Sequence, residues 1–186
     1  TQGYATVYCA RPYDLKEGSL KERMIFVRPT IFLGVPRVWE KFHEGLKTAG
    51  KRMEELRGLR AQMPIACCIR QTTAARWARL QGLRTAREMQ HGGSGHSTSY
   101  FGLADAVVLS RIRAALGLDA CKYCLTGAAP VMMETLEAFG SCAIQVNEVY
   151  GMSESTAYGT LSTSEMHLWG SCGVAGPGGQ VAIFKY

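Results

Sequence analysis

The stretch ACKYCLTGAAPVMMETLEAFGSCAIQVNEVYGMSEST, residues 120–156, contains two strand-like segments separated by a short helix-like segment. The first strand-like segment, at 121–126, enters a tight turn. The segment "PVMMETLEAFG" then begins with proline and ends with glycine, which is typical of a short helix. A second strand-like segment follows at 143–149. This alternation predicts βαβ units and an α/β fold, with a mostly parallel sheet flanked by helices.

Each strand-like segment is followed by residues that suit a nucleotide. In an open α/β sheet, ligands gather at the carboxyl ends of the strands. Small residues at 127–129 allow a flat ligand to approach the backbone closely. The Tyr150 ring can stack on such a ligand, Ser153 can donate to a phosphate oxygen, and Glu154 can hold Mg²⁺. The alternatives are structural: a turn into a helix, a bend after a strand, and a serine that caps a helix.

Composition indicates an ordinary globular protein with one local charged segment. The 186 residues are 47% hydrophobic, without the run of 18 apolar residues that a membrane span needs. Residues 51–87 hold nine Lys and Arg against two Glu, whereas the whole chain has a net charge of +6. The basic character is therefore local, which argues against a nucleic-acid-binding fold. Both ends interrupt strand-like sequence, so we expect a segment of a longer protein.

The cysteines suggest no disulfide framework. There are seven, at positions 9, 67, 68, 121, 124, 142 and 172, and reduced thiols in a cytosolic compartment are the simpler interpretation. Cys121 and Cys124 have the spacing of half a zinc site. No second pair follows, and residues three apart in a strand point to opposite faces, so metal binding there is not expected.

Several blocks of the sequence resemble a known family. "LTGAAPVMMETLEAF" followed by "VNEVYGMSEST" resembles the paired nucleotide motifs of the adenylate-forming (AMP-dependent) superfamily. Upstream, "GYATVYCARPYDLKEGSLKERMIFVRPTIFLGVPRVWEKF" is similar to long-chain acyl-CoA synthetases, especially the bubblegum type. "GSCGVAGPGGQVAI" resembles the glycine-rich turn that follows in that family. The resemblance covers residues 3–48 and 100–184, in the family's order and spacing.

The resemblance implies roles for individual residues. Tyr150 would pack on the adenine of ATP or of the acyl-adenylate, and Gly151 and Met152 continue the same nucleotide motif. Ser153 would contact the α-phosphate, and Glu154 would bind Mg²⁺. Trp39 would gate the fatty-acyl tunnel, although a tryptophan at helical spacing is as readily a core residue. The adenine pocket would be lined by Gly127, Ala128 and Ala129.

The implied activity is that of a long-chain-fatty-acid–CoA ligase. A fatty acid would react with Mg·ATP to give an acyl-adenylate, which coenzyme A would convert to acyl-CoA. The family's phosphate loop, ribose-binding aspartate and catalytic lysine have no match here, so we expect an inactive fragment of a large N-terminal domain. Residues 1–186 would form a partial AMP-binding domain, with a basic helical insert at about 49–99. The alternative is a non-catalytic or truncated relative that binds nucleotide or lipid.

The resemblance also implies a cellular setting. Its substrate dissolves in membranes, so the basic segment 51–87 can be interpreted as a contact for anionic headgroups. A solvated surface insert is the simpler interpretation of the same charges. We expect a cytoplasmic protein, with peripheral contact to the endoplasmic reticulum or another membrane, and no nucleic-acid partner.

Overall fold

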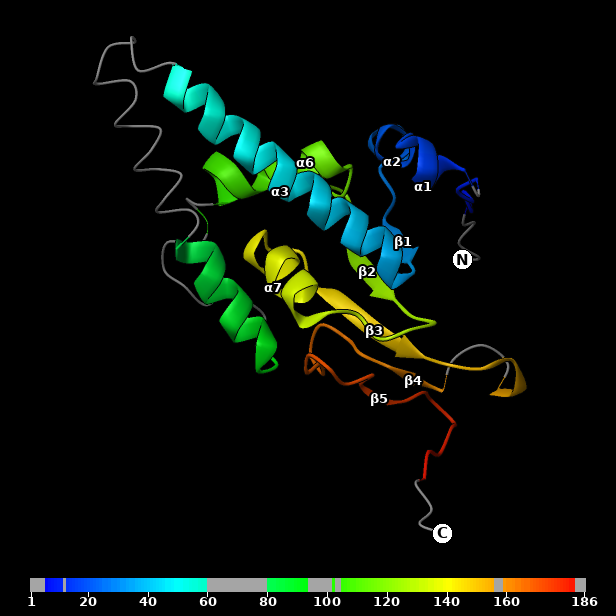
Figure 1. Ribbon diagram of the computed structural model, residues 1–186. Helices are drawn as coiled ribbons and strands as arrows, with labels where there is room; N and C mark the ends of the chain where they lie inside the picture. The colour runs from blue at the N-terminus through cyan, green and yellow to red at the C-terminus, as the bar shows by residue number, and fades with distance from the viewer. Residues whose placement is uncertain are drawn as a thin grey trace.

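The computed structural model describes residues 6–11, 13–59, 80–93, 102, 105–155 and 159–182. Its sheet has five strands in the order β1-β2-β3-β4-β5 (Figure 1). Neighbouring strands are parallel from β1 to β3 and antiparallel from β3 to β5. The predicted α/β fold is confirmed, with a parallel half and an antiparallel half. The strand bounds are β1 Ile31–Gly34, β2 Tyr123–Thr126, β3 Val146–Tyr150, β4 Thr160–Leu161 and β5 Val174–Ala175.

The helices precede and connect the parallel strands. The longest, α3, begins at Pro36, whose fixed φ suits the first turn of a helix. A further helix occupies residues 80–90. Among the described residues, none of the helices combines the length and apolar character required to cross a membrane. The helix bounds are α1 Asp14–Glu17, α2 Leu20–Val27, α3 Pro36–Leu59, the π-helical turn η1 Asp105–Leu109, α6 Ser110–Leu116, α7 Met133–Ser141 and the 3₁₀ turn η2 Ser153–Ser155.

The unit β2-α7-β3 forms the predicted βαβ crossover. Helix α7 begins at Met133, three residues later than the proline at which we expected it to begin. The reason is local: Met132 is extended, with φ −68° and ψ 136°, so the turn after β2 continues to that residue. The turn is therefore longer than the sequence pattern indicated.

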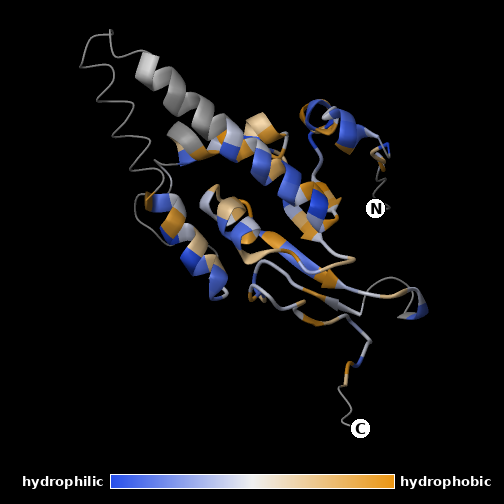
Figure 2. Cartoon of the chain, in the orientation of Figure 1, coloured by the Kyte–Doolittle hydropathy of each residue, from blue (hydrophilic) through white to orange (hydrophobic). Residues whose placement is uncertain are grey.

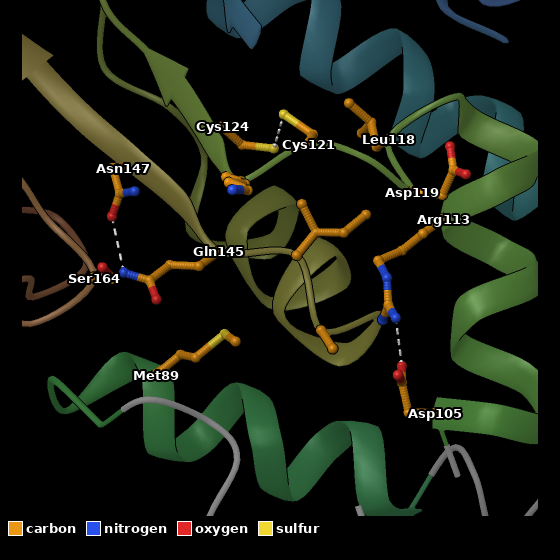
Figure 3. A pocket seen from close by; sticks show the side chains of 13 residues that line it. Met89, Asp105, Arg113, Leu118, Asp119, Cys121, Cys124, Gln145, Asn147 and Ser164 are labelled. Atoms are coloured by element: carbon orange, nitrogen blue, oxygen red, sulfur yellow. Dashed lines mark hydrogen bonds and ion pairs between the residues drawn. The ribbon is translucent and has the colours of Figure 1, made fainter. Parts of the chain in front are cut away.

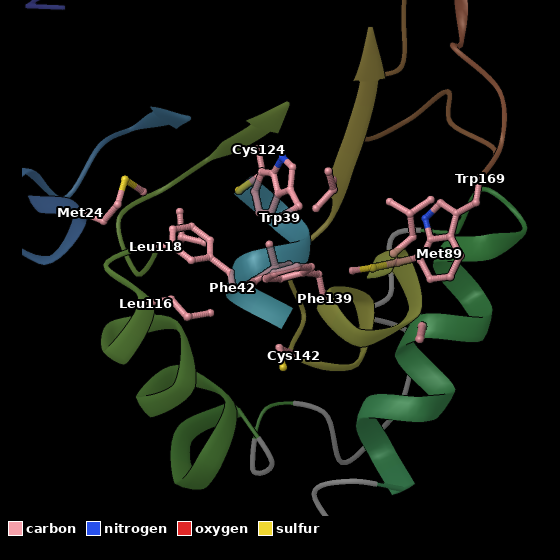
Figure 4. Close-up of a cluster of buried hydrophobic side chains, with 14 of the residues drawn as sticks. Met24, Trp39, Phe42, Met89, Leu116, Leu118, Cys124, Phe139, Cys142 and Trp169 are labelled. Carbon is pink, nitrogen blue, oxygen red and sulfur yellow. The ribbon is translucent and has the colours of Figure 1, made fainter. Parts of the chain in front are cut away.

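The core lies between the sheet and the helices α3 and α7 (Figure 4). The Trp39 ring is at its centre and meets Phe139 edge-on, with ring centroids 5.0 Å apart. The Trp39 ring also packs edge-on against Phe32 of β1, at 5.2 Å. Aromatic side chains bury large apolar areas, so this cluster fixes α3 and α7 on the sheet.

Hydropathy follows this packing. Apolar colour concentrates on the parallel strands in Figure 2, while polar residues alternate with apolar ones along the helices. One sheet face is nevertheless open among the described residues, because Ile31, Leu33 and Tyr123 are each at least half exposed. Phe32 and Cys124, which alternate with them, turn inward to the core. The helices α3 and α7 thus cover one face of the parallel strands.

Candidate nucleotide site

The parallel pairing of β2 and β3 brings the two predicted turns to one edge of the sheet. Thr126, the last residue of β2, is in register with Glu148 of β3. Because the strands run the same way, the turns that follow them both leave from the carboxyl edge. Figure 1 shows these two connections leaving the same end of the sheet. The fold therefore juxtaposes two motifs that are more than twenty residues apart in the sequence.

The first turn lies directly against the second strand. A Cβ built on Gly127 would stand 2.9 Å from the carbonyl oxygen of Val149, closer than Cβ atoms are found. The next residue, Ala128, has a left-handed backbone with φ 71°. A non-glycine residue in that region is uncommon, and such conformations occur often at ligand sites. Glycine at 127 thus permits a backbone approach that places this turn beside the residue before Tyr150.

Tyr150 presents part of its ring to solvent. The side chain is 49% exposed at the end of β3. Its backbone is fixed, because the Tyr150 carbonyl oxygen accepts a hydrogen bond of 2.8 Å from the N–H of Gly159. A Cβ on Gly159 would contact the ring at 3.9 Å. An anchored backbone with a half-exposed ring is suited to stacking on a flat ligand.

The residues of the second turn are open to solvent. Gly151, Met152, Ser153 and Glu154 are all exposed, and Ser153 begins the turn η2. No cluster of three or more His, Cys, Asp or Glu side chains occurs within the described ranges. A lone exposed carboxylate fits Mg²⁺, which usually takes one or two protein carboxylates and completes its coordination with phosphates and water. The single carboxylate of Glu154 therefore suits a metal ion that is already bound to a nucleotide.

Glu148 is a further acid near this edge that the sequence interpretation did not use. It is half-buried, and its carboxylate accepts a hydrogen bond of 3.0 Å from the Gly170 N–H. Burial raises the pKa of this carboxyl above its usual value, and the Gly170 N–H offsets part of the rise. The signal was an acid inside a strand-like segment, two residues before Tyr150.

Trp39 lies in the core. Its side chain is fully buried, and its indole N–H donates a hydrogen bond of 3.1 Å to the Gly34 carbonyl. Phe32, Phe42 and Phe139 surround the ring. The ring contacts and the indole hydrogen bond together give both the apolar and the polar part of the Trp39 side chain a partner in the core. The predicted role of Trp39 as a gate stays a prediction.

A cavity of about 310 Å³ lies away from the two turns, at the amino ends of β2 and β3 (Figure 3). Its lining includes Cys121, Gln145 and Asn147, together with the ion-paired Asp105 and Arg113. The Gln145 amide donates to Asn147, at 2.8 Å, so part of the polar lining is already satisfied. Ligands of such sheets bind at the other edge. The turns at 127–130 and 150–154, and not this cavity, are therefore the candidate nucleotide site.

Parallel strands with small and polar turns at their carboxyl edge are typical of α/β proteins that bind nucleotides. Comparison with known proteins specifies the class further: the profile of the AMP-binding enzyme family matches residues 1–185. The chain belongs to this family of AMP-binding enzymes.

Individual relatives are fatty-acid–CoA ligases by name. The chain is 41% identical to long-chain-fatty-acid–CoA ligase ACSBG2 of Gallus gallus, over 96% of this chain and 21% of the relative. It is 40% identical to the ACSBG2 of Xenopus laevis, over 89% of this chain and 20% of the relative. A putative fatty-acid–CoA ligase, fadD11 of Mycobacterium tuberculosis, is 33% identical over 84% of this chain and 26% of the relative. The chain thus spans about a fifth of the two ACSBG2 proteins. No solved structure matches it significantly.

Proposed function

We propose that this chain is the central part of the AMP-binding domain of a long-chain-fatty-acid–CoA ligase. One observation carries the proposal: the parallel register of β2 and β3, with Gly127 against Val149, sets the two nucleotide motifs side by side. The family assignment and the names of the relatives support the same activity. The proposed adenine site has the small residues of the first turn on one side and the Tyr150 ring on the other.

In the proposed reaction, a carboxylate oxygen of the fatty acid attacks the α-phosphorus of ATP and pyrophosphate leaves. The thiol of coenzyme A then attacks the acyl carbonyl carbon, and AMP leaves. No protein nucleophile takes part, so the chain contributes binding and orientation. Mg²⁺, when bound, neutralises charge on the phosphate oxygens. In this proposal the chain's own residues contribute a ring for the base, a donor to the α-phosphate and a carboxylate for the metal.

Each residue of the two turns has a role in this proposal. Tyr150 stacks on the adenine, opposite the small residues of the first turn. Ser153 donates to the α-phosphate, and Glu154 binds Mg²⁺ through its exposed carboxylate. Gly151 and Met152 connect the ring to the polar residues. The adenine pocket is completed by Gly127, Ala128 and Ala129.

The test measures ATP-dependent acyl-CoA formation by the complete product of the gene. Tyr150→Ala should raise the KM for ATP about tenfold, since stacking of a base on an aromatic ring contributes about 1–3 kcal/mol. Its matched control is Tyr123→Ala. Tyr123 is 50% exposed, much like Tyr150, but it lies at the amino end of β2, away from the two turns. Glu154→Gln should lower activity about 100-fold and raise the Mg²⁺ requirement. Its control is Glu165→Gln, which changes an exposed acid in the connection between β4 and β5.

The rival function is a non-catalytic relative that binds nucleotide or lipid. It predicts ATP binding that depends on Tyr150 but no acyl-CoA from any long-chain fatty acid. Equal activity of the Tyr150 and Tyr123 variants would instead reject the proposed adenine site. The two outcomes are distinguishable. ATP binding without acyl-CoA formation rejects the ligase reaction, whereas equal activity of the two variants rejects the adenine site.

The proposal also extends to domain limits and location. Residues 1–186 form a partial AMP-binding domain with a basic helical insert at about 49–99, much of which lies outside the described residues. The protein works in the cytoplasm and contacts a membrane peripherally through the basic segment 51–87. Vesicle flotation tests this contact: binding should require anionic lipid and weaken with salt. Binding that ignores lipid charge and salt rejects it.

A further inference from the structure

Two cysteine thiols meet at the amino end of β2. The Sγ atoms of Cys121 and Cys124 are 3.5 Å apart, with the Cys124 thiol donating toward Cys121 (Figure 3). We expected residues at this spacing to point to opposite faces of a strand, and that expectation was wrong. The reason is that β2 begins at Tyr123, so Cys121 precedes the strand and lies in a bent segment.

Backbone hydrogen bonds hold this bend in place. The Cys121 N–H donates to the Leu118 carbonyl, at 3.2 Å. The N–H groups of Lys122 and Tyr123 both donate to the Thr30 carbonyl, at 2.8 and 3.3 Å. These bonds fix the backbone of the segment that carries both thiols.

The two thiols differ in environment. Cys121 is partly exposed and Cys124 is buried, and both line the 310 Å³ cavity at this edge. The hydrogen bond from Cys124 lowers the pKa of the Cys121 thiol, whereas that contact and burial raise the pKa of Cys124. Cys121 is thus the more accessible thiol of the pair and the more readily ionised.

We propose that Cys121 and Cys124 are a redox-active pair that a hydroperoxide converts to an intramolecular disulfide. The Cys121 thiolate attacks one peroxide oxygen, the O–O bond breaks, and the sulfenic acid forms as the other oxygen leaves as hydroxide. The Cys124 thiol then attacks the Cys121 sulfur, the S–O bond breaks, and water leaves. In sum, two thiols are oxidised to one disulfide while one hydrogen peroxide is reduced to two waters.

A disulfide fits the pair better than a metal ion does. Bound zinc takes four ligands, and no His, Asp or Glu within the described ranges completes a group of three with these thiols. The sulfurs need to approach from 3.5 Å to the bonded distance of about 2.05 Å. This short movement, across a two-residue gap, is the geometric basis of the proposal.

The experiment treats the reduced 186-residue chain with hydrogen peroxide and maps its cysteines by mass spectrometry. The expected product has lost two hydrogen atoms and carries a Cys121–Cys124 link that a reductant removes. Cys121→Ser and Cys124→Ala should each abolish that link. The matched control is the double variant Cys9→Ser/Cys172→Ser, which removes two exposed thiols and should retain it. Circular dichroism establishes that each variant is folded.

A second measurement needs no variant. Reduced wild-type chain at neutral pH should alkylate at Cys121 about tenfold faster than at Cys172, whose pKa is raised by burial and by the nearby Glu148 carboxylate. In Cys124→Ala, peroxide should leave a sulfenic acid at Cys121 that dimedone traps. Peroxide that oxidises Cys9 and Cys172 while Cys121 and Cys124 stay as free thiols would overturn the proposal. So would a zinc-dependent loss of both thiols that a chelator reverses.

Discussion

Gly127 and Val149 are in such close contact that a Cβ on Gly127 would stand 2.9 Å from the Val149 carbonyl oxygen. The atom that this Cβ would meet belongs to the backbone of β3. A backbone atom cannot move aside as the end of a flexible side chain can. Any larger residue at 127 therefore separates the first turn from the strand that carries Tyr150. Together with the pairing of β2 and β3, this contact couples the two turns of the candidate nucleotide site.

Gly127→Ala should weaken nucleotide binding by the complete gene product about tenfold and lower stability by about 1–3 kcal/mol, as overpacking does. The KM for ATP and urea unfolding measure the two effects. Gly45→Ala is the matched control: Gly45 is exposed within α3, and a Cβ there meets nothing within 4 Å. That variant should gain about 0.5–1 kcal/mol, because alanine favours helix. An unchanged KM for ATP in Gly127→Ala would contradict the coupling.

Trp39 should behave as a core residue in unfolding experiments. Trp39→Ala should lower the free energy of unfolding by about 3–5 kcal/mol, since the ring is fully buried among aromatic side chains. Trp39→Phe keeps an aromatic ring but leaves the Gly34 carbonyl without its indole donor, which should cost about 1–3 kcal/mol. Urea denaturation measures both. A loss below about 1 kcal/mol in Trp39→Ala would be inconsistent with this packing.

The gating prediction for Trp39 has a different readout. If the ring also gates an acyl tunnel, Trp39→Phe in the complete protein should change the preference among fatty-acid chain lengths at a temperature where the variant stays folded. A variant that loses stability but keeps the wild-type chain-length preference would leave Trp39 with its core role only.

Glu148→Gln should stabilise the chain at neutral pH. Burial raises the folded-state pKa of Glu148 above its ordinary value of 4.5, so the folded chain favours the protonated acid. Its contribution to stability is therefore full below pH 4.5 and is lost as the pH rises through the folded-state value. The neutral amide in the Glu148→Gln variant does not ionise, so this loss of stability does not occur. Its oxygen can still accept the hydrogen bond from the Gly170 N–H. The expected gain is about 0.5 kcal/mol, because the group is only half-buried.

Thermal unfolding across pH measures this effect. The midpoint difference between Glu148→Gln and wild type should be small near pH 4 and should grow toward pH 7. Glu165→Gln is the control for the loss of one carboxylate, because its side chain is exposed. A Glu148→Gln variant that is less stable than wild type at pH 7 would show that the charge itself holds the Gly170 segment.

The sequence predicted those parts of the fold that local chemistry determines. Pro36 begins α3, and Gly117 ends α6 with a left-handed φ of 71°, and both positions suit the backbone preferences of proline and glycine. The order of strand and helix between 121 and 150 was sufficient to predict the parallel pairing of β2 and β3. That pairing places the two nucleotide turns at one edge, so the candidate site followed from local patterns and a general rule for α/β sheets.

Other features depend on tertiary contacts that no local pattern contains. The bend that joins Cys121 to Cys124 requires the Thr30 carbonyl, which comes from a segment some ninety residues earlier. The spacing of Trp39 fits a helix face equally well whether that face meets a core or a tunnel. The approach of Gly127 to Val149 is likewise visible only once the strands are paired. These are the points where packing, and not propensity, decides the outcome.

The purified 186-residue chain should not catalyse exchange between ATP and pyrophosphate. The resemblance to adenylate-forming enzymes implies a Ser/Thr/Gly-rich phosphate loop, a ribose-binding aspartate and a catalytic lysine, and none of these motifs has a match in the sequence. Without them the chain lacks the groups that hold the triphosphate and the reacting carboxylate, and positioning is most of what such a reaction requires. The complete gene product is the positive control for radiolabelled exchange. Exchange by the 186-residue chain that disappears in Tyr150→Ala and persists in Tyr123→Ala would show that these two turns are sufficient for activity.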